Sequence, residues 1–212
     1  MKVEIYSDIA CPWCFIGKRR FDQALTAFAG ADDVEVVYRP FQLVPDAPME
    51  PTPHRAWLQE RYGPQSRAMD DRVAAIGKDE GIDYDFDAAL HVNTVHGHRL
   101  LWLAEHEYGP ETQVDLKERL LAAHFSEGVD VADFAALTEI AVAAGMDRAR
   151  VEAFLPSDEG RAETASELEH ARAIGVSSVP TFVFEGKYAV QGAQETETFL
   201  QALQQIQQMQ GQ

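Results

Sequence analysis

The chain of 212 residues has two cysteines, and they lie three positions apart in the segment Cys11-Pro12-Trp13-Cys14. Residues 3–6, before this segment, alternate polar and apolar side chains, which predicts a short strand. After it, apolar residues recur at helical spacing until Gly30, which predicts a helix. Two cysteines so spaced at the start of a helix face the same side, so their sulfur atoms can form a disulfide. The spacing therefore predicts a redox-active dithiol.

The first cysteine has the position of a nucleophile. We expect Cys11 at the helix N-terminus, where unpaired backbone N–H groups and the helix dipole stabilise a thiolate and lower its pKa. Pro12 suits the first helical turn because its nitrogen needs no intrahelical partner there. Cys11 is thus expected to be the exposed nucleophile that attacks a disulfide or thiol, and Cys14, one turn deeper, the resolving thiol.

Two other interpretations of the cysteine pair are a zinc half-site and two buried structural cysteines. A structural zinc site generally needs four ligands, and the chain has no second cysteine pair. The histidines at His91, His96 and His98 have no acidic or cysteine partner at ligand spacing, and helical positions two apart point away from each other. We expect no metal site.

A second feature lies far along the chain. Residues 175–181, with the sequence Gly-Val-Ser-Ser-Val-Pro-Thr, predict a loop. The next residues predict two short strands joined by a tight turn at Glu185-Gly186, which is a β-hairpin. Pro180 opens the first of these strands, where a missing N–H donor is tolerated. The residues alone leave the Val179–Pro180 bond open between the commoner trans state and the cis state.

These features together resemble a known superfamily. Val-Pro-Thr before a hairpin, combined with an N-terminal Cys-x-x-Cys motif, is similar to the thioredoxin superfamily. The stretches that resemble DsbA-family oxidoreductases of the FrnE-like type are, in order, residues 7–21, 93–94 with 98–100, 125 with 127–128, 175–180, and 186–190 with 192–194. This branch is related to 2-hydroxychromene-2-carboxylate isomerases and kappa-class glutathione transferases. Some FrnE-like proteins carry a further cysteine pair, which this chain lacks.

The resemblance implies an α/β thioredoxin-like fold (β-α-β … β-β-α) interrupted by a large all-helical insertion. Residues 1–50 and 173–212 would form the two parts of the thioredoxin-like domain, and residues 51–172 the insertion, a lid over the active site. Alternation predicts a second strand over residues 34–39. Helical spacing predicts helices over residues 66–80, 93–108, 111–125, 131–144, 147–154, 157–174 and 195–209.

The resemblance also implies how the site is arranged. The Val179–Pro180 bond would be cis and would lie against the cysteines. Substrate contacts are then expected from Pro12, Trp13, Val179 and Pro180. Aromatic residues that either line the groove under the lid or belong to the core are Trp13, Trp57, Tyr62 and Trp102.

Charged residues near the motif have two interpretations each. Asp8, three residues before Cys11, is a candidate proton relay if burial raises its pKa, or a loop carboxylate that caps the cysteine helix. The basic run Lys18, Arg19 and Arg20 either attracts an anionic thiol such as glutathione or forms a solvated helix face.

Composition and charge limit the cell compartment and the binding partners that we expect. The formal net charge of −17 argues against nucleic acid or an anionic membrane as a partner, and 46% hydrophobic residues allow a substantial core. The first residues lead directly into a strand without an apolar signal segment, and no later stretch is apolar enough to span a membrane. We expect a cytoplasmic protein, where a lone cysteine pair is catalytic rather than structural.

Two functions remain open. The first is a thiol–disulfide oxidoreductase that acts on protein or small-molecule thiols and disulfides, with no tightly bound cofactor and with glutathione as a candidate co-substrate. The alternative is a glutathione-dependent isomerase or transferase on the same fold. Relatives of that second class typically have serine where Cys11 stands, so two cysteines favour redox chemistry. The oligomeric state and the direction of electron transfer stay open.

Overall fold

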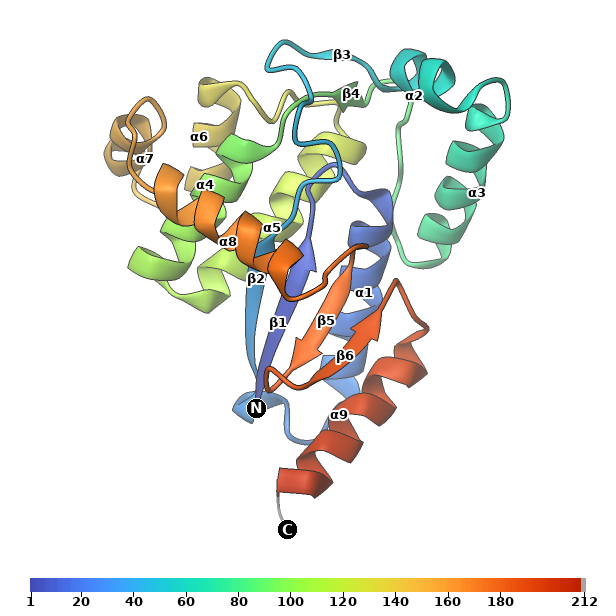
Figure 1. The fold of residues 1–212 in the computed structure, drawn as a ribbon, viewed down its shortest axis with the longest axis vertical. Helices are drawn as coiled ribbons and strands as arrows, with labels where there is room; N and C mark the ends of the chain where they lie inside the picture. Colours follow the sequence, from blue (N-terminus) through green and yellow to red (C-terminus); the bar gives the residue numbers. More distant parts are fainter. Residues whose placement is uncertain (211–212) are drawn as a thin grey trace.

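The computed structural model describes residues 1–210, and its centre is a four-stranded sheet in the order β2-β1-β5-β6 (Figure 1). β1 is parallel to β2 and antiparallel to β5, and β5 is antiparallel to β6. The strands are β1 (Lys2–Ser7), β2 (Glu35–Pro40), β5 (Thr181–Phe184) and β6 (Tyr188–Gln191). This β-α-β … β-β-α arrangement confirms the predicted α/β thioredoxin-like fold, including the hairpin.

One face of the sheet is covered by α1 (Pro12–Ala27) and α9 (Thr196–Gln210). Phe21 of α1 packs on Phe182 of β5 and on Phe199 of α9, with ring centroids 5.2 and 5.6 Å apart. All three rings are fully buried. Burial of such a side chain stabilises a fold by about 1.5–3 kcal/mol, so this aromatic cluster fixes the helix that begins at the cysteines.

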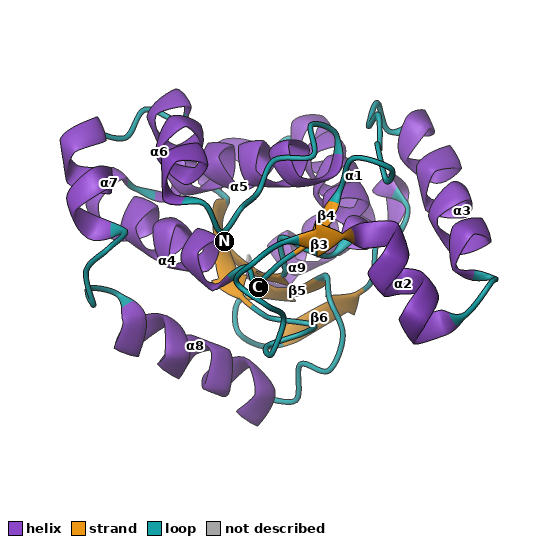
Figure 2. Ribbon diagram, turned by 90° about the horizontal axis from the view of Figure 1, so that it is seen from above, coloured by secondary structure: helices purple, strands orange, loops and turns teal. Residues whose placement is uncertain are grey.

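The opposite face of the sheet is covered by α8 (Arg161–Ala173), as Figure 2 shows from above. Side chains alternate along a strand, so Tyr6 of β1 points away from the aromatic cluster. It packs instead with Phe41, with Ala171 of α8 and with Val176. The segment before the hairpin therefore returns to the sheet over this second face.

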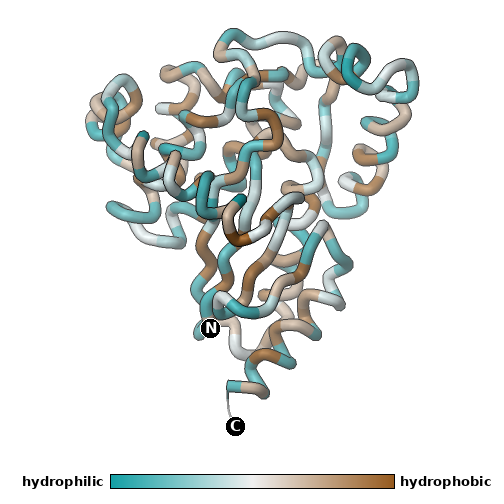
Figure 3. Tube along the Cα trace, viewed as in Figure 1, coloured by the Kyte–Doolittle hydropathy of each residue, from teal (hydrophilic) through white to brown (hydrophobic). Residues whose placement is uncertain are grey.

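The segment between β2 and β5 is mainly helical and, apart from α8, gathers at one end of the sheet (Figures 1 and 2). The hydropathy colouring in Figure 3 places brown segments on the strands and inner helices and teal segments on outer turns. Besides α8, the elements of this segment are β3 (Thr52–Pro53), α2 (His54–Tyr62), α3 (Ser66–Asp79), β4 (Leu90–His91), α4 (Val95–Leu103), the π-helical η2 (Ala104–Tyr108), α5 (Pro110–Phe125), α6 (Phe134–Ala143) and α7 (Arg148–Phe154).

Helix α5 connects this helical segment to the sheet. The side-chain amide of Gln113 accepts a hydrogen bond from the Tyr38 N–H (2.8 Å) and donates one to the Tyr38 carbonyl (3.0 Å). Further along the helix, Leu116 and Leu120 are fully buried in a cluster with Ile9, which lies just before the cysteine segment. One helix thus contacts both the second strand and the loop that leads to the dithiol.

The segment between β2 and β5 differs from the expectation of an all-helical insertion, because β3 and β4 pair as a short antiparallel ladder. Several helices also begin later than predicted. α8 starts at Arg161 because Gly160, with φ +70°, breaks the helical path, and α6 starts after Asp133, whose carboxylate accepts the Ala136 N–H. None of the helices described over residues 1–210 is both long and apolar enough to cross a membrane.

Candidate active site

The two cysteines meet at the N-terminus of α1. Cys11 is the N-cap residue, Pro12 is the first helical residue, and Cys14 lies in the first turn, where its N–H donates to the Cys11 carbonyl at 3.0 Å. The cysteines approach to 3.4 Å and both are free thiols. The strand and helix on either side lie where the sequence predicts them, and they bring the two sulfurs within reach of disulfide formation.

Both thiols are buried, contrary to the expectation that Cys11 is exposed. The exposed fractions are 3% for Cys11 and 2% for Cys14. The Cys11 thiol can donate its proton to the Val179 carbonyl (3.6 Å) or to the Cys14 sulfur, and the Tyr84 hydroxyl donates to the Pro12 carbonyl (2.6 Å). The hairpin loop and the segment after α3 therefore close over the motif from two sides. Of the motif's side chains, Trp13 is the exposed one, at 36%.

The loop opposite the dithiol contains a cis peptide bond between Val179 and Pro180, as the resemblance implied. The Pro180 ring packs on α1 at Gly17, where an added Cβ would lie 2.8 Å from the proline Cγ. Gly17 was not predicted as a site residue. Its signal was available, because a glycine inside a predicted apolar helix face often marks a close approach of another segment.

Ionisation of the pair differs from the expectation for Cys11. Its hydrogen bond with Cys14, its burial and the adjacent sulfur raise the pKa of Cys11 well above the ordinary thiol value. Burial opposes ionisation of Cys14, but the hydrogen bond from Cys11 and the charge of Lys117 outweigh it and lower the pKa of Cys14. The expectation of a lowered pKa at Cys11 is therefore wrong for this reduced arrangement, because a thiol–thiolate pair shares one charge.

Asp8 does not cap the cysteine helix, and the raised pKa on which the predicted proton relay depends is not found. Burial acts to raise the pKa of Asp8. The hydrogen bond and charge of His98, together with the hydrogen bond from the Leu43 N–H, outweigh burial and lower this pKa, so Asp8 is a carboxylate. Its oxygens accept from the Leu43 N–H (2.8 Å) and the Thr94 hydroxyl (2.9 Å), and lie 3.3 Å from His98 Nε2. No side chain caps α1. Asp8 instead joins the cysteine loop to two distant segments.

A buried lysine lies behind the dithiol, and the sequence analysis missed it. Lys117 on α5 is 0% exposed, and its Nζ has no hydrogen-bond partner among residues 1–210. Burial lowers the pKa of Lys117 to about 8, against the opposing charges of Cys14 and Asp8. The available signal was helical spacing, because Val114, Leu120 and Leu121 stand three or four positions from Lys117 on the same face of the predicted helix.

The basic run after the motif is paired with carboxylates. Lys18 contacts Asp22 at 2.6 Å and Glu118 at 3.2 Å. Arg19 contacts Glu118 at 2.6 Å, and Arg20 contacts Glu80, also at 2.6 Å. These ion pairs neutralise the run, so it is neither a free anion-binding patch nor a simple solvated face.

A cavity of about 220 Å³ opens beside the dithiol loop at Asp8 and Ala10. Two of the predicted aromatic residues, Trp57 and Tyr62, line it together with Arg61. Trp57 stacks on His91 with ring centroids 4.0 Å apart, and the Arg61 guanidinium lies 5.7 Å from the centre of the Trp57 ring. The cavity thus has aromatic walls and a cation at its edge.

The other two aromatic candidates lie elsewhere. Trp102 packs against His106 and Phe154 within the helical segment, with ring centroids 4.4 and 6.4 Å away. It belongs to the core and not to the groove. Trp13 does not line the cavity but is exposed within the motif itself.

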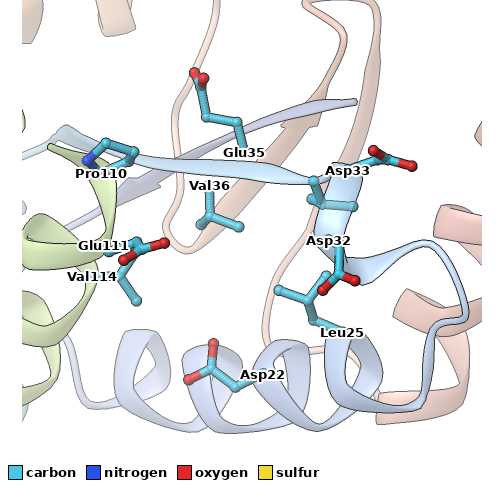
Figure 4. A pocket seen from close by; sticks show the side chains of 10 residues that line it. Asp22, Leu25, Asp32, Asp33, Glu35, Val36, Pro110, Glu111 and Val114 are labelled. Atoms are coloured by element: carbon cyan, nitrogen blue, oxygen red, sulfur yellow. The ribbon is translucent and has the colours of Figure 1, made fainter.

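A second, larger cavity of about 550 Å³ lies between α1, β2 and α5 and contains neither cysteine (Figure 4). Five carboxylates line it, from Asp22, Asp32, Asp33, Glu35 and Glu111. This concentration of negative charge disfavours an anionic thiol such as glutathione. Within the described part of the chain, no group of three or more histidine, cysteine, aspartate or glutamate residues is placed to hold a metal ion.

The family model that matches the chain is the DSBA-like thioredoxin domain, over residues 2–204. The chain belongs to the DSBA-like thioredoxin family. Among solved members, the crystal structure of "probable DsbA oxidoreductase SCO1869" from Streptomyces coelicolor is 38% identical with a TM-score of 0.88, covering 97% of this chain and 89% of that one. The family resemblance inferred from the cysteine motif and the Val-Pro-Thr loop is confirmed.

Two further proteins are similar to this chain along most of its length. "Uncharacterized protein YwbO" from Bacillus subtilis (strain 168) is 27% identical over 204 residues, which is 95% of this chain and 94% of the relative. The cytosolic disulfide reductase DsbM from Pseudomonas aeruginosa, solved with GSH, is 18% identical with a TM-score of 0.66, covering 98% of this chain and 100% of that one. At 18% identity the second likeness shows the shared fold.

Proposed function

We propose that this DSBA-like protein catalyses thiol–disulfide exchange, with Cys11 as the nucleophile and Cys14 as the resolving thiol. The observation that carries the proposal is the approach of the two free cysteines to 3.4 Å at the N-terminus of α1. A shared proton between two sulfurs so close lets either carry the negative charge. Cys11 is the better placed to attack, because it is the N-cap residue, where the helix dipole favours a thiolate.

The exchange has two steps. The Cys11 thiolate attacks one sulfur of a substrate disulfide, so that its S–S bond breaks, a mixed disulfide forms, and the leaving thiolate takes up a proton. Cys14 then loses its proton and attacks the Cys11 sulfur, which releases the second substrate thiol and leaves a Cys11–Cys14 disulfide. Two electrons pass from the protein to the substrate. Two thiols such as glutathione restore the dithiol by the reverse sequence and become a disulfide.

Substrate contacts in this proposal come from the walls of the motif. Pro12 and Trp13 follow Cys11 in the motif, and the Val179–Pro180 loop reaches it through the hydrogen bond from the Cys11 thiol to the Val179 carbonyl. That carbonyl would become free to accept from a substrate N–H when the thiol loses its proton. The neighbouring cavity has aromatic walls, Arg61 at its edge and the Asp8 carboxylate in its lining, and we propose that it admits a small thiol whose anionic group lies near Arg61.

We extend the proposal to a cytoplasmic setting with glutathione as a co-substrate. A lone cysteine pair in a reducing compartment is more often catalytic than structural. The solved DsbM structure is of a cytosolic disulfide reductase with GSH, which supports the same setting for a protein of this fold. The redox potential, measured by equilibration with glutathione buffers, would give the direction of electron transfer.

The proposal is tested by exchange assays on purified protein. Wild type should reduce insulin disulfides in the presence of glutathione or dithiothreitol. Cys11→Ser should abolish the activity, and Cys14→Ser should accumulate mixed disulfides that mass spectrometry detects. In the opposite result, the wild type exchanges no disulfides. Wild type and Cys11→Ser then both isomerise a chromene carboxylate with glutathione. That outcome would establish the alternative, a glutathione-dependent isomerase or transferase.

A further inference from the structure

Lys117 is placed behind the dithiol by contacts on either side of it along α5. One turn before it, Gln113 is fixed to the backbone of Tyr38 by two hydrogen bonds. One turn after it, Leu121 packs in a cluster with Phe15 and Ile16, which follow Cys14 directly. Residues four positions apart share one face of a helix, so the Lys117 side chain leaves α5 toward β2 and the first turn of α1.

The ammonium group of Lys117 reaches this space without a partner of its own. Its Nζ lies 5.7 Å from the centre of the buried Tyr38 ring, and no hydrogen bond or ion pair to it is found among residues 1–210. A buried charge without a partner is strongly unfavourable. Burial therefore favours the neutral amine, and Lys117 keeps its charge only where a negative group lies close to it.

We infer that Lys117 is the counter-charge of the reduced dithiol and stabilises the thiolate that Cys11 and Cys14 share. This inference rests on the proposed exchange reaction and deepens it. Lys117 would be a positioning residue that acts through the thiolate and does not touch the substrate. The other candidate anion, Asp8, already has its own donors in Leu43, Thr94 and His98. Charged and titratable groups face Lys117 from every surrounding element. They are Cys11, Cys14, Lys18, Asp8, Tyr38 and His98.

Protons and electrons balance when Lys117 takes part in the reaction. Reduction of the Cys11–Cys14 disulfide by two thiols adds two electrons and two protons to the protein. One proton forms a thiol, and the other is bound by Lys117 where that amine was neutral, so the second sulfur stays a thiolate. Oxidation removes the thiolate, and Lys117 then binds its proton more weakly. Lysine protonation and cysteine oxidation are thus linked, and each acts on the other by the same free energy.

The first test uses Lys117→Met, which keeps an unbranched side chain and removes the charge. The thiolate pKa, followed by absorbance at 240 nm, should rise. The equilibrium constant for reduction of the protein disulfide by glutathione at pH 7 should fall about tenfold. At an effective dielectric constant of 20, the attraction between two close opposite charges is at least as large as the free energy of a tenfold change in an equilibrium constant. Tenfold corresponds to about 30 mV toward a more negative potential.

Leu116→Ala is the matched control, because Leu116 is a fully buried neighbour on α5 that carries no charge. It should destabilise the protein while leaving the thiolate titration and the glutathione equilibrium unchanged. If Lys117→Met moved neither quantity, or if Leu116→Ala moved both equally, Lys117 would be a structural residue and the inference would be wrong.

A second measurement needs no variant and covers the case in which Lys117→Met does not fold. NMR titration of the Lys117 side chain should give a higher pKa in the dithiothreitol-reduced protein than in the oxidised protein. Equal values in the two states would overturn the inference. The proposed function is tested separately, because a wild type that exchanges no disulfides would refute that function whatever Lys117 does.

Discussion

The ring of Pro180 lies directly on Gly17 of α1, a contact that joins the hairpin loop to the helix that carries the dithiol. A Cβ at position 17 would lie 2.8 Å from the proline Cγ and 3.5 Å from the backbone of Ala193. The proline ring is rigid, so the clash cannot be relieved by a side-chain rotation alone.

Gly17→Ala should therefore destabilise the protein despite the better helix propensity of alanine. Overpacking costs about 1–3 kcal/mol, against a gain of about 1 kcal/mol from propensity. Chemical denaturation measures the change in the free energy of unfolding, and exchange activity should fall because the loop moves away from Cys11. Gly81→Ala is a useful comparison, because nothing lies within 4 Å of an added Cβ there although its φ is +72°. Unchanged activity in Gly17→Ala would argue against a role for this contact in positioning the loop.

Asp8→Asn tests the polar cluster that joins the cysteine loop to residues 43, 94 and 98. The carboxamide nitrogen would face at least one of the donors that now bind the Asp8 oxygens. A buried donor left unsatisfied costs about 1–3 kcal/mol, and we expect a loss of stability in that range. The folded pKa of Asp8 is lowered, so its stabilising effect is complete above the unfolded pKa and declines as the pH falls. The difference between wild type and Asp8→Asn should therefore shrink in acid.

His124→Leu tests a source of acid sensitivity. Burial lowers the pKa of His124 to about 4, and its Nδ1 has no hydrogen-bond partner among the described residues. Between about pH 6.5 and pH 4 the unfolded chain binds a proton at this histidine and the folded chain does not, so stability falls as the pH falls. The loss from this group is about 3 kcal/mol, since each pKa unit is worth about 1.4 kcal/mol.

The measurement is the free energy of unfolding of His124→Leu and wild type at pH 7 and pH 4.5. The variant should lose less stability over this interval than wild type. His170→Gln, at an exposed position on α8, is the control and should behave as wild type. Equal acid losses in wild type and His124→Leu would contradict the prediction.

Arg61→Gln tests whether the cavity beside the dithiol attracts anions. Arg61 pairs with no carboxylate among residues 1–210, and its guanidinium lies against Trp57 and Tyr62 at the cavity edge. We expect kcat/KM for glutathione disulfide to fall about two- to fivefold, as for an exposed charge pair, with little change for the neutral bis(2-hydroxyethyl) disulfide. Arg67→Gln, on α3 and outside the cavity, is the control. A parallel loss for both substrates would show that Arg61 acts on structure and not on charge.

Much of the fold could be predicted from local sequence. The strand before Cys11, the helix after it and the hairpin at Glu185-Gly186 depend on nearby residues, and each forms as predicted. The short β3 and β4 strands could not be predicted in the same way. They are two residues long and depend on pairing between segments almost 40 positions apart.

The site was less predictable than the fold, because its electrostatics depend on distant residues. The partners of Asp8 lie 35, 86 and 90 positions away, and together they reverse the direction that burial alone would give its pKa. Lys117 is one of several lysines in the sequence, and only packing of α5 against the sheet makes it a buried charge. The pKa values of Cys11 and Cys14 shift in opposite directions because of their closeness and the charge of Lys117, and the motif alone does not give these contacts.

The hydrogen bonds of Gln113 to the N–H and C=O of Tyr38 have a consequence for association with other chains. β2 is the outermost strand on its side of the sheet, and such a strand offers free backbone groups to which a foreign strand can add. The amide of Gln113 occupies the donor and the acceptor of Tyr38 as the peptide group of an added strand would. The helix that carries Lys117 toward the dithiol thereby also protects this edge of the sheet from intermolecular β-pairing and aggregation.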